Sequence, residues 1–293
     1  GTGPFIFKSY QKDAIIRYAS NKDYWDGAPA FDNLVYAITV DPNVRVQRLK
    51  AGECLFGNNL KGDTASAFDN DPNVKLVRSN PLYTAYLSPN AKKKFLSDKR
   101  LREALWLALD KKTYIQAVES GQGTPAVSFL PPAMWSHDAT LKDRADLEQA
   151  RALVKASGYD GRELVLFAAL GGNRKLAGEL LQADWAKVGV KVSVRMMELG
   201  EMYKRTGAGE HDIVLLSWYS DNGDPDNFLA PNLSCAADQS GGNKAHWCEP
   251  RFDALLDAAV ATPDIARRSE LYTQAQRMAY DQVPVIQIGR AHV

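Results

Sequence analysis

The feature that most constrains this chain is a regular alternation of strand and helix patterns in one central stretch. The strands are recognised by short apolar or alternating runs, and the helices by apolar residues at helical spacing. In chain order they are a strand at residues 164–168, a helix at 176–188, a strand at 190–196, a helix at 198–205 and a strand at 213–216. The last run is continuously apolar, which is typical of a strand covered on both faces. This order predicts an open α/β sheet with parallel strands.

The 293 residues are enough for about two domains. The amino-terminal part is predicted to be β-rich, because short apolar runs are separated by turn residues. These runs are residues 5–7, 15–18, 34–38 and 74–77. Helical patterns begin after a predicted cap at Asp98 or Ser97. Two more helices, around residues 252–259 and 271–278, are expected to pack against the sheet. We predict a β-rich region at 1–82, an α/β region at 83–283 and a closing segment at 284–293.

Composition excludes several classes of function. Lysine and arginine total 36 and aspartate and glutamate 35, scattered along the chain, so no field that would collect nucleic acid is expected. The longest aliphatic run, residues 213–216, is far shorter than the ~20 apolar residues of a membrane-spanning helix. No GxSxG or HExxH motif is present, and the four histidines are dispersed. We expect no catalytic residues, no metal site and no cofactor.

The candidate binding residues follow the last predicted strand. Ligands of open α/β sheets bind beyond the carboxyl ends of the strands. Trp218, Tyr219, Ser220 and Asp221 stand at that position and combine aromatic surface, a hydroxyl and a carboxylate. This combination suits a ligand with an ammonium group. Asp224 and Asp226, which flank a proline, are better explained by a turn and a helix cap; for Asp221, a binding role and a structural role both remain open.

Cys235 and Cys248 are separated by twelve residues rich in glycine, serine, aspartate and asparagine. A disulfide between them would stabilise this poorly apolar loop by roughly 3 kcal/mol, and it would indicate an oxidising compartment. Two unrelated buried thiols are the alternative. A metal site that includes His246 is a weaker one, because no fourth ligand is evident.

Several segments resemble the extracellular solute-binding proteins of bacterial peptide importers. They are residues 1–5, 23–25, 51–54, 131–135, 182–190 and 221–228, of which the last two together are quite specific. The resemblance implies a two-lobed, periplasmic-binding-protein type II-like α/β fold, with an incomplete first lobe and a largely complete second lobe. It implies that Asp221 holds the amino terminus of a peptide, that Trp218, Tyr219 and Ser220 complete this strand end, and that Cys235 pairs with Cys248.

Three departures limit this comparison. The family begins well before the Gly-Thr-Gly-Pro-Phe segment, so part of the first lobe is expected to be missing and Cys54 to be a lone thiol. Where the family carries an Arg-Pro-Tyr segment that grips the peptide carboxylate, the loop at 169–173 is shorter, so that anchor does not transfer and Arg174 is not assigned to the role. Residues 288–293 resemble a translated sequencing adapter, and we set them aside.

The resemblance implies a monomeric, non-catalytic, periplasmic component of an ABC transporter. It would capture di- or short peptides in an interlobe cleft and deliver them to the permease subunits. A binder of haem or of a chelated metal on the same scaffold is the alternative. A further alternative is a hydrolase that uses Asp221 and Asp224 as acid and base. The predicted turn role of Asp224 argues against it.

Overall fold

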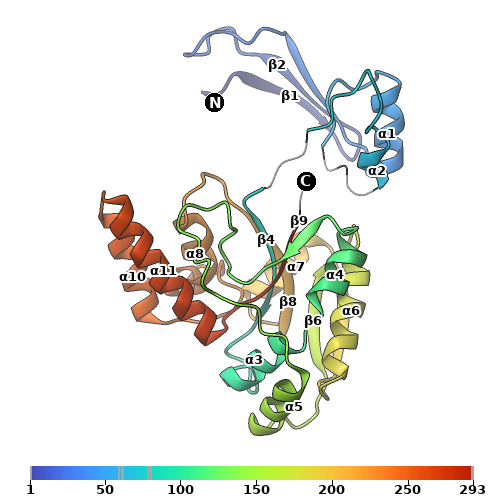
Figure 1. Cartoon of the computed structure of the whole chain (residues 1–293). Coiled ribbons are helices and arrows are strands. Elements are labelled where there is room, and N and C mark those ends of the chain that lie inside the picture. Colours follow the sequence, from blue (N-terminus) through green and yellow to red (C-terminus); the bar gives the residue numbers. More distant parts are fainter. Residues whose placement is uncertain (1, 59, 61–62, 78–80, 292–293) are drawn as a thin grey trace. The chain divides into compact units, whose positions relative to one another are not determined.

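The structure, a computed structural model, describes residues 2–58, 60, 63–77 and 81–291. The chain forms two compact units, residues 1–77 and residues 78–293 (Figure 1). The lobe boundaries drawn from the sequence, 1–82, 83–283 and 284–293, stay predictions. None of the helices in the described ranges has both the length and the apolar character needed to cross a membrane.

The smaller unit contains a three-stranded antiparallel sheet in the order β1–β2–β3. Its strands are β1 (Phe5–Gln11), β2 (Ile15–Ser20) and β3 (Asn33–Ala37), followed by α1 (Pro42–Lys50) and α2 (Asp63–Ser66). The predicted strands at 5–7, 15–18 and 34–38 are confirmed. Residues 74–77 form no strand, so that prediction is wrong. Their apolar pattern suits a strand, but in the described part of the unit no neighbouring strand pairs with them.

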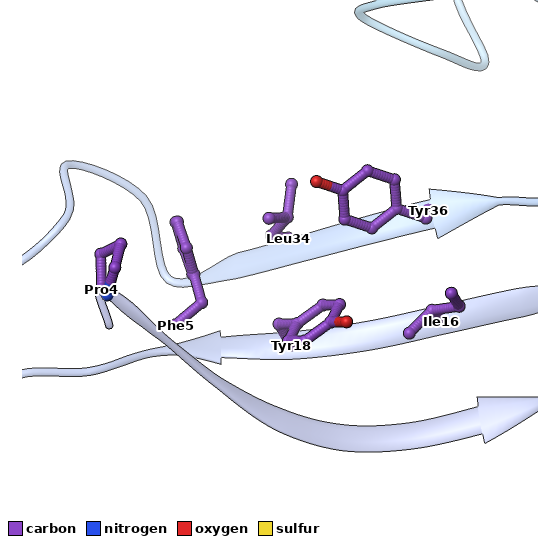
Figure 2. A pocket seen from close by; sticks show the side chains of 6 residues that line it. All are labelled: Pro4, Phe5, Ile16, Tyr18, Leu34 and Tyr36. Carbon is purple, nitrogen blue, oxygen red and sulfur yellow. The ribbon is translucent and has the colours of Figure 1, made fainter. Parts of the chain in front are cut away.

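One face of this sheet collects apolar and aromatic side chains. Tyr18 lies opposite Phe7 on one neighbouring strand and Leu34 on the other, so all three point to the same side. A hollow of about 400 Å³ opens over this face (Figure 2). Its lining is Pro4, Phe5, Ile16, Tyr18, Leu34 and Tyr36. These residues carry no charge, so the hollow lacks the carboxylate that the sequence led us to seek.

The larger unit is built on a six-stranded mixed sheet in the order β5–β9–β4–β8–β6–β7. Its strands are β4 (Tyr83–Pro89), β5 (Gly123–Pro125), β6 (Leu164–Ala169), β7 (Val192–Met197), β8 (Ile213–Tyr219) and β9 (Ile286–Ala291). Its helices are α3 (Lys99–Leu107), α4 (Lys111–Val118), α5 (Leu147–Ala156), α6 (Arg174–Ala186), α7 (Leu199–Gly207), α8 (Asp226–Leu233), α9 (Cys235–Gln239), α10 (Pro250–Ala261) and α11 (Ile265–Gln282).

The predicted alternation is confirmed in the order β6, α6, β7, α7, β8, with β6 parallel to both β7 and β8. The sequence did not predict β4, which runs antiparallel to β8 along its whole length. β9 also pairs antiparallel with β4 and includes residues of the segment that we set aside, whose origin stays a prediction. The predicted cap is confirmed: the Asp98 carboxylate accepts a hydrogen bond from the backbone N–H of Arg100.

Two apolar clusters lie on opposite faces of this sheet. In β6, Leu166 and Ala168 belong to one cluster, whereas Phe167 and Ala169 belong to the other. The first cluster includes side chains of α3, α4, α5 and α6, and the second includes side chains of α7, α8, α10 and α11 (Figure 1). Because helices cover both faces, these strands are apolar at successive positions, which made them recognisable in the sequence.

Candidate functional site

Strand β8 carries the candidate residues to the edge of the sheet. Residues 213–216 are buried, Trp218 is half-buried and Tyr219 is exposed, so the strand emerges from the core towards its carboxyl end. The backbone N–H of Ser220 still bonds the carbonyl of Leu82, at 2.9 Å. The loop therefore begins at Asp221, beyond the last pairing of β8 with the segment that leads into β4.

Tyr219 provides the accessible aromatic surface of the site. Its ring packs on that of Tyr83 on the neighbouring strand, with centroids 4.5 Å apart, and 49% of the residue is exposed. Tyr83 is buried, and burial raises the pKa of its hydroxyl. Trp218 points to the other face, where it packs against the second apolar cluster and leaves its buried indole nitrogen without a partner among the described residues. Tyr219 is thus the more accessible of the two.

Asp221 is exposed, and its carboxylate is held from one side. The side-chain amide of Asn227 donates to Oδ2 of Asp221 at 3.1 Å, and the amide oxygen of Asn227 accepts from the backbone N–H of Asp221 at 2.9 Å. Within the described residues, Oδ1 of Asp221 has no hydrogen-bond partner. The carboxylate is oriented by the protein and keeps one oxygen for another donor.

Two side-chain acceptors stabilise the turn that follows the end of β8. The Ser220 hydroxyl accepts from the N–H of Gly223 at 2.8 Å, and the Asn222 amide oxygen accepts from the N–H of Asp224 at 3.0 Å. Gly223 has a φ of 75°, in the region that favours glycine. Ser220 therefore shapes the turn through its hydroxyl oxygen, while its O–H remains a donor.

Asp224 and Asp226 are engaged in contacts that stabilise the fold. Asp224 accepts from the N–H of Asp226 at 3.0 Å, which confirms the predicted turn, whereas the helix cap itself is Pro225. The Asp224 carboxylate also pairs with Arg268 of α11, at 2.9 Å, a partner that the sequence did not reveal. Asp226 is half-buried, and burial, followed by the charge of Asp224, raises the pKa of its carboxyl group.

The loop after β6 reaches the same edge of the sheet, because β6 and β8 are parallel neighbours (Figure 1). Leu170, Gly171 and Gly172 in this loop are exposed, and α6 begins at Arg174. Arg174 is half-buried and close enough to Tyr83 for its positive charge to lower the pKa of that hydroxyl, against the larger effect of burial. A cation therefore lies near the Tyr83–Tyr219 pair, together with the carboxylate of Glu119, which also affects Tyr83.

Cys235 and Cys248 form a disulfide, as predicted, with Cα atoms 4.6 Å apart. The metal alternative is wrong because the two sulfur atoms are bonded to each other. His246 instead contacts the Asp238 carboxylate through Nδ1 at 2.7 Å and the carbonyl of Thr206 through Nε2 at 3.0 Å. Cys54 in the smaller unit is a free, half-buried thiol.

The chain is similar to known bacterial solute-binding proteins. Residues 1–240 match the family model described as bacterial extracellular solute-binding proteins, family 5 middle. The chain is 46% identical to di/tripeptide-binding protein 4 of Pseudomonas aeruginosa, covering 99% of this chain and 56% of that protein. It is 37% identical to heme-binding protein A of Haemophilus influenzae, covering 99% of this chain and 54% of that protein.

Two solved structures are similar over the whole chain. One is a dipeptide-binding protein of Pseudoalteromonas in complex with Met-Leu, with a TM-score of 0.89, 34% identity and 59% of that chain covered. The other is a periplasmic binding protein of Helicobacter pylori in complex with the peptide STSA, with a TM-score of 0.91, 30% identity and 58% of that chain covered. The predicted periplasmic-binding-protein fold is confirmed, and the chain spans little more than half the length of these relatives.

Proposed function

Because the chain belongs to family 5 of the bacterial extracellular solute-binding proteins, we propose that the full-length protein containing it captures short peptides in the periplasm for an ABC importer. The curated relatives named as di/tripeptide-binding proteins and the solved structures that hold peptides support this proposal. Within the chain, the observation that carries it is the oriented carboxylate of Asp221, with one oxygen available, at the carboxyl edge of the sheet.

In this proposal Asp221 accepts a charge-assisted hydrogen bond from the ammonium group of the peptide, the kind of bond that is strong and directional. Tyr219 contributes its exposed ring to the ligand, Trp218 supports the strand end from the core side, and the Ser220 hydroxyl shapes the loop and keeps a donor. Peptide contacts that form only when two lobes close would shift a hinge equilibrium, and the permease subunits would recognise the closed state. The protein would act as a monomer.

We further propose that the protein is not an enzyme. Membership of a family of solute-binding proteins supports this. So does the state of Asp224, the second carboxylate of the hydrolase alternative, which is paired with Arg268 and accepts a bond from Tyr272 at 3.4 Å. Asp224 is thus committed to structural contacts with two side chains of α11.

Binding of haem on the same scaffold is the second candidate. The similarity to heme-binding protein A supports it, as does the short loop at 169–173, which lacks the carboxylate anchor expected of a peptide binder. Haem added to the purified full-length protein would give a shifted Soret absorbance band if it bound specifically, and an unshifted band would exclude this candidate.

The peptide proposal is tested by calorimetric titration of the full-length protein with a dipeptide such as Ala-Leu. Asp221→Asn is expected to weaken binding about 10- to 100-fold, because a cationic group loses its charged partner. Glu148→Gln is the matched control, since it removes a charge from a carboxylate on α5 whose side chain is 95% exposed. If Asp221→Asn binds as tightly as the unmodified protein, Asp221 is not in the site; if no di- or tripeptide binds, the proposed function is wrong.

A further inference from the structure

Asn227 is positioned to control the carboxylate on which the proposed function rests. It lies in the first turn of α8, six residues after Asp221, and its side-chain amide bonds both the backbone and the carboxylate of that residue. We propose that Asn227 is a positioning residue, which holds the Asp221 carboxylate in the orientation that receives the ammonium group of the ligand.

The two bonds fix the amide and the carboxylate together. The amide oxygen of Asn227 faces an N–H, and its NH₂ faces a carboxylate oxygen, so only one orientation of the amide satisfies both contacts. The same contact ties Oδ2 of Asp221 to the helix. Oδ1, which has no partner within the described residues, is thereby presented on the other side of the carboxylate.

The backbone of Asn227 is held in place by its neighbours. Its backbone N–H bonds the carbonyl of Asp224, and the Asp224 side chain is paired with Arg268 of α11. The next residue, Phe228, is fully buried in the second apolar cluster. Asn227 is therefore fixed to the core on its helical side while its amide reaches the exposed loop. A binding group is more effective when the residues that support it are already ordered.

The chemistry of the amide matters as much as its place. A neutral donor can orient a carboxylate without cancelling its charge, whereas lysine or arginine at this position would form an ion pair with Asp221 and compete with a cationic ligand. An asparagine here thus orders the Asp221 carboxylate without adding a positive charge that would compete with the ligand. If the proposed function holds, this arrangement favours ligands that carry a positive group over neutral ones.

The test uses the full-length protein and calorimetric titration with Ala-Leu. Asn227→Ala is expected to weaken binding about 10-fold, as for a lost hydrogen bond to a charged group. Asn227→Lys, which keeps a donor but adds a competing charge, is expected to weaken binding at least as much. The matched control is Asn222→Ala, which removes a turn acceptor from the same loop. It should change affinity less than about 2-fold, because loss of the bond from the N–H of Asp224 to Asn222 leaves the contacts between Asn227 and Asp221 in place.

A double-mutant cycle separates positioning from a general effect on the loop. If Asn227 acts through Asp221, adding Asn227→Ala to Asp221→Asn should cause little further loss. An equal loss in both backgrounds, or an equal loss in Asn222→Ala, would overturn the inference. If Asp221→Asn weakens binding but Asn227→Ala does not, the positioning role of Asn227 is wrong and the proposed site stands. If Asp221→Asn has no effect on peptide binding, both the proposed site and the positioning role are wrong.

Discussion

His211 makes the stability of the larger unit sensitive to mild acid. The residue lies two positions before the start of β8, is fully buried, and donates from Nε2 to the carbonyl of Lys244 at 2.8 Å. Its Nδ1 is buried without a partner among the described residues, so a second proton there would have no acceptor. Burial lowers the pKa of His211 to about 3. The hydrogen bond to the Lys244 carbonyl opposes this effect, whereas the positive charges of Lys93 and Lys244 act in the same direction as burial.

The direction and size of the effect follow from linkage. In the unfolded chain the histidine has an ordinary pKa near 6.5, so between pH 6.5 and 3 the unfolded state binds a proton that the folded state does not. The stabilisation is therefore complete above pH 6.5 and is lost as the pH falls. At pH 5 the loss is about 2 kcal/mol relative to pH 7.5.

Urea denaturation of the full-length protein at pH 7.5 and pH 5.0 measures this loss. His211→Leu is the comparison, because leucine fills much of the same space and cannot titrate. The variant should be less stable at both pH values, since it leaves the Lys244 carbonyl without its donor. Its free energy of unfolding should nevertheless fall by about 2 kcal/mol less than that of the unmodified protein between the two pH values. An equal fall in both proteins, or an NMR titration of His211 near pH 6.5, would refute the reasoning.

Two further predictions concern stability. Reduction of the Cys235–Cys248 disulfide, or its removal in a double alanine variant, should lower the free energy of unfolding by about 3 kcal/mol, and a urea midpoint unchanged by dithiothreitol would contradict this. Tyr86→Phe removes a buried hydrogen bond of 3.0 Å to Asn232 and leaves an unsatisfied amide oxygen, which should cost about 1–2 kcal/mol. Thermal unfolding measures this loss, with the exposed Tyr36→Phe as a control that should change stability by less than about 0.5 kcal/mol.

The sequence predicted the part of the sheet whose strands have a simple pattern. β6 and β8 are covered by helices on both faces, and their apolar runs made them visible. β4 is equally buried but contains Thr84 and Ser88 among its apolar residues, so it has neither a continuous run nor a clean alternation. The polar residues are tolerated through tertiary contacts, such as the bond from the Thr84 hydroxyl to the carbonyl of Phe129 at 3.0 Å. A local pattern could not reveal such partners.

Asp221 could be singled out from the sequence because its position depends only on where β8 ends. The polar partners of Asp221 and Asp224, which are Asn227 and Arg268, could not be identified in this way. Asn227 lies in the first turn of α8, where an asparagine has several possible partners, and the folded structure shows that it bonds Asp221. Arg268 is 44 residues beyond Asp224, on a helix whose position depends on the packing of the second cluster.

The pairing of Asp224 with Arg268 also distinguishes Asp224 from Asp221 as a possible partner for a cationic ligand. Local turn chemistry explained Asp224 completely, since its side chain accepts from the N–H of Asp226, and nothing in the sequence required a second partner. In the folded protein α11 brings a guanidinium to Asp224, whereas the side-chain partner of the Asp221 carboxylate among the described residues is a neutral amide. The negative charge of Asp224 is balanced by Arg268, and within the part of the chain that the structure describes no ion pair balances that of Asp221. The difference between two aspartates three residues apart is therefore a property of helix packing, which places one of them against α11 and leaves the other exposed at the edge of the sheet.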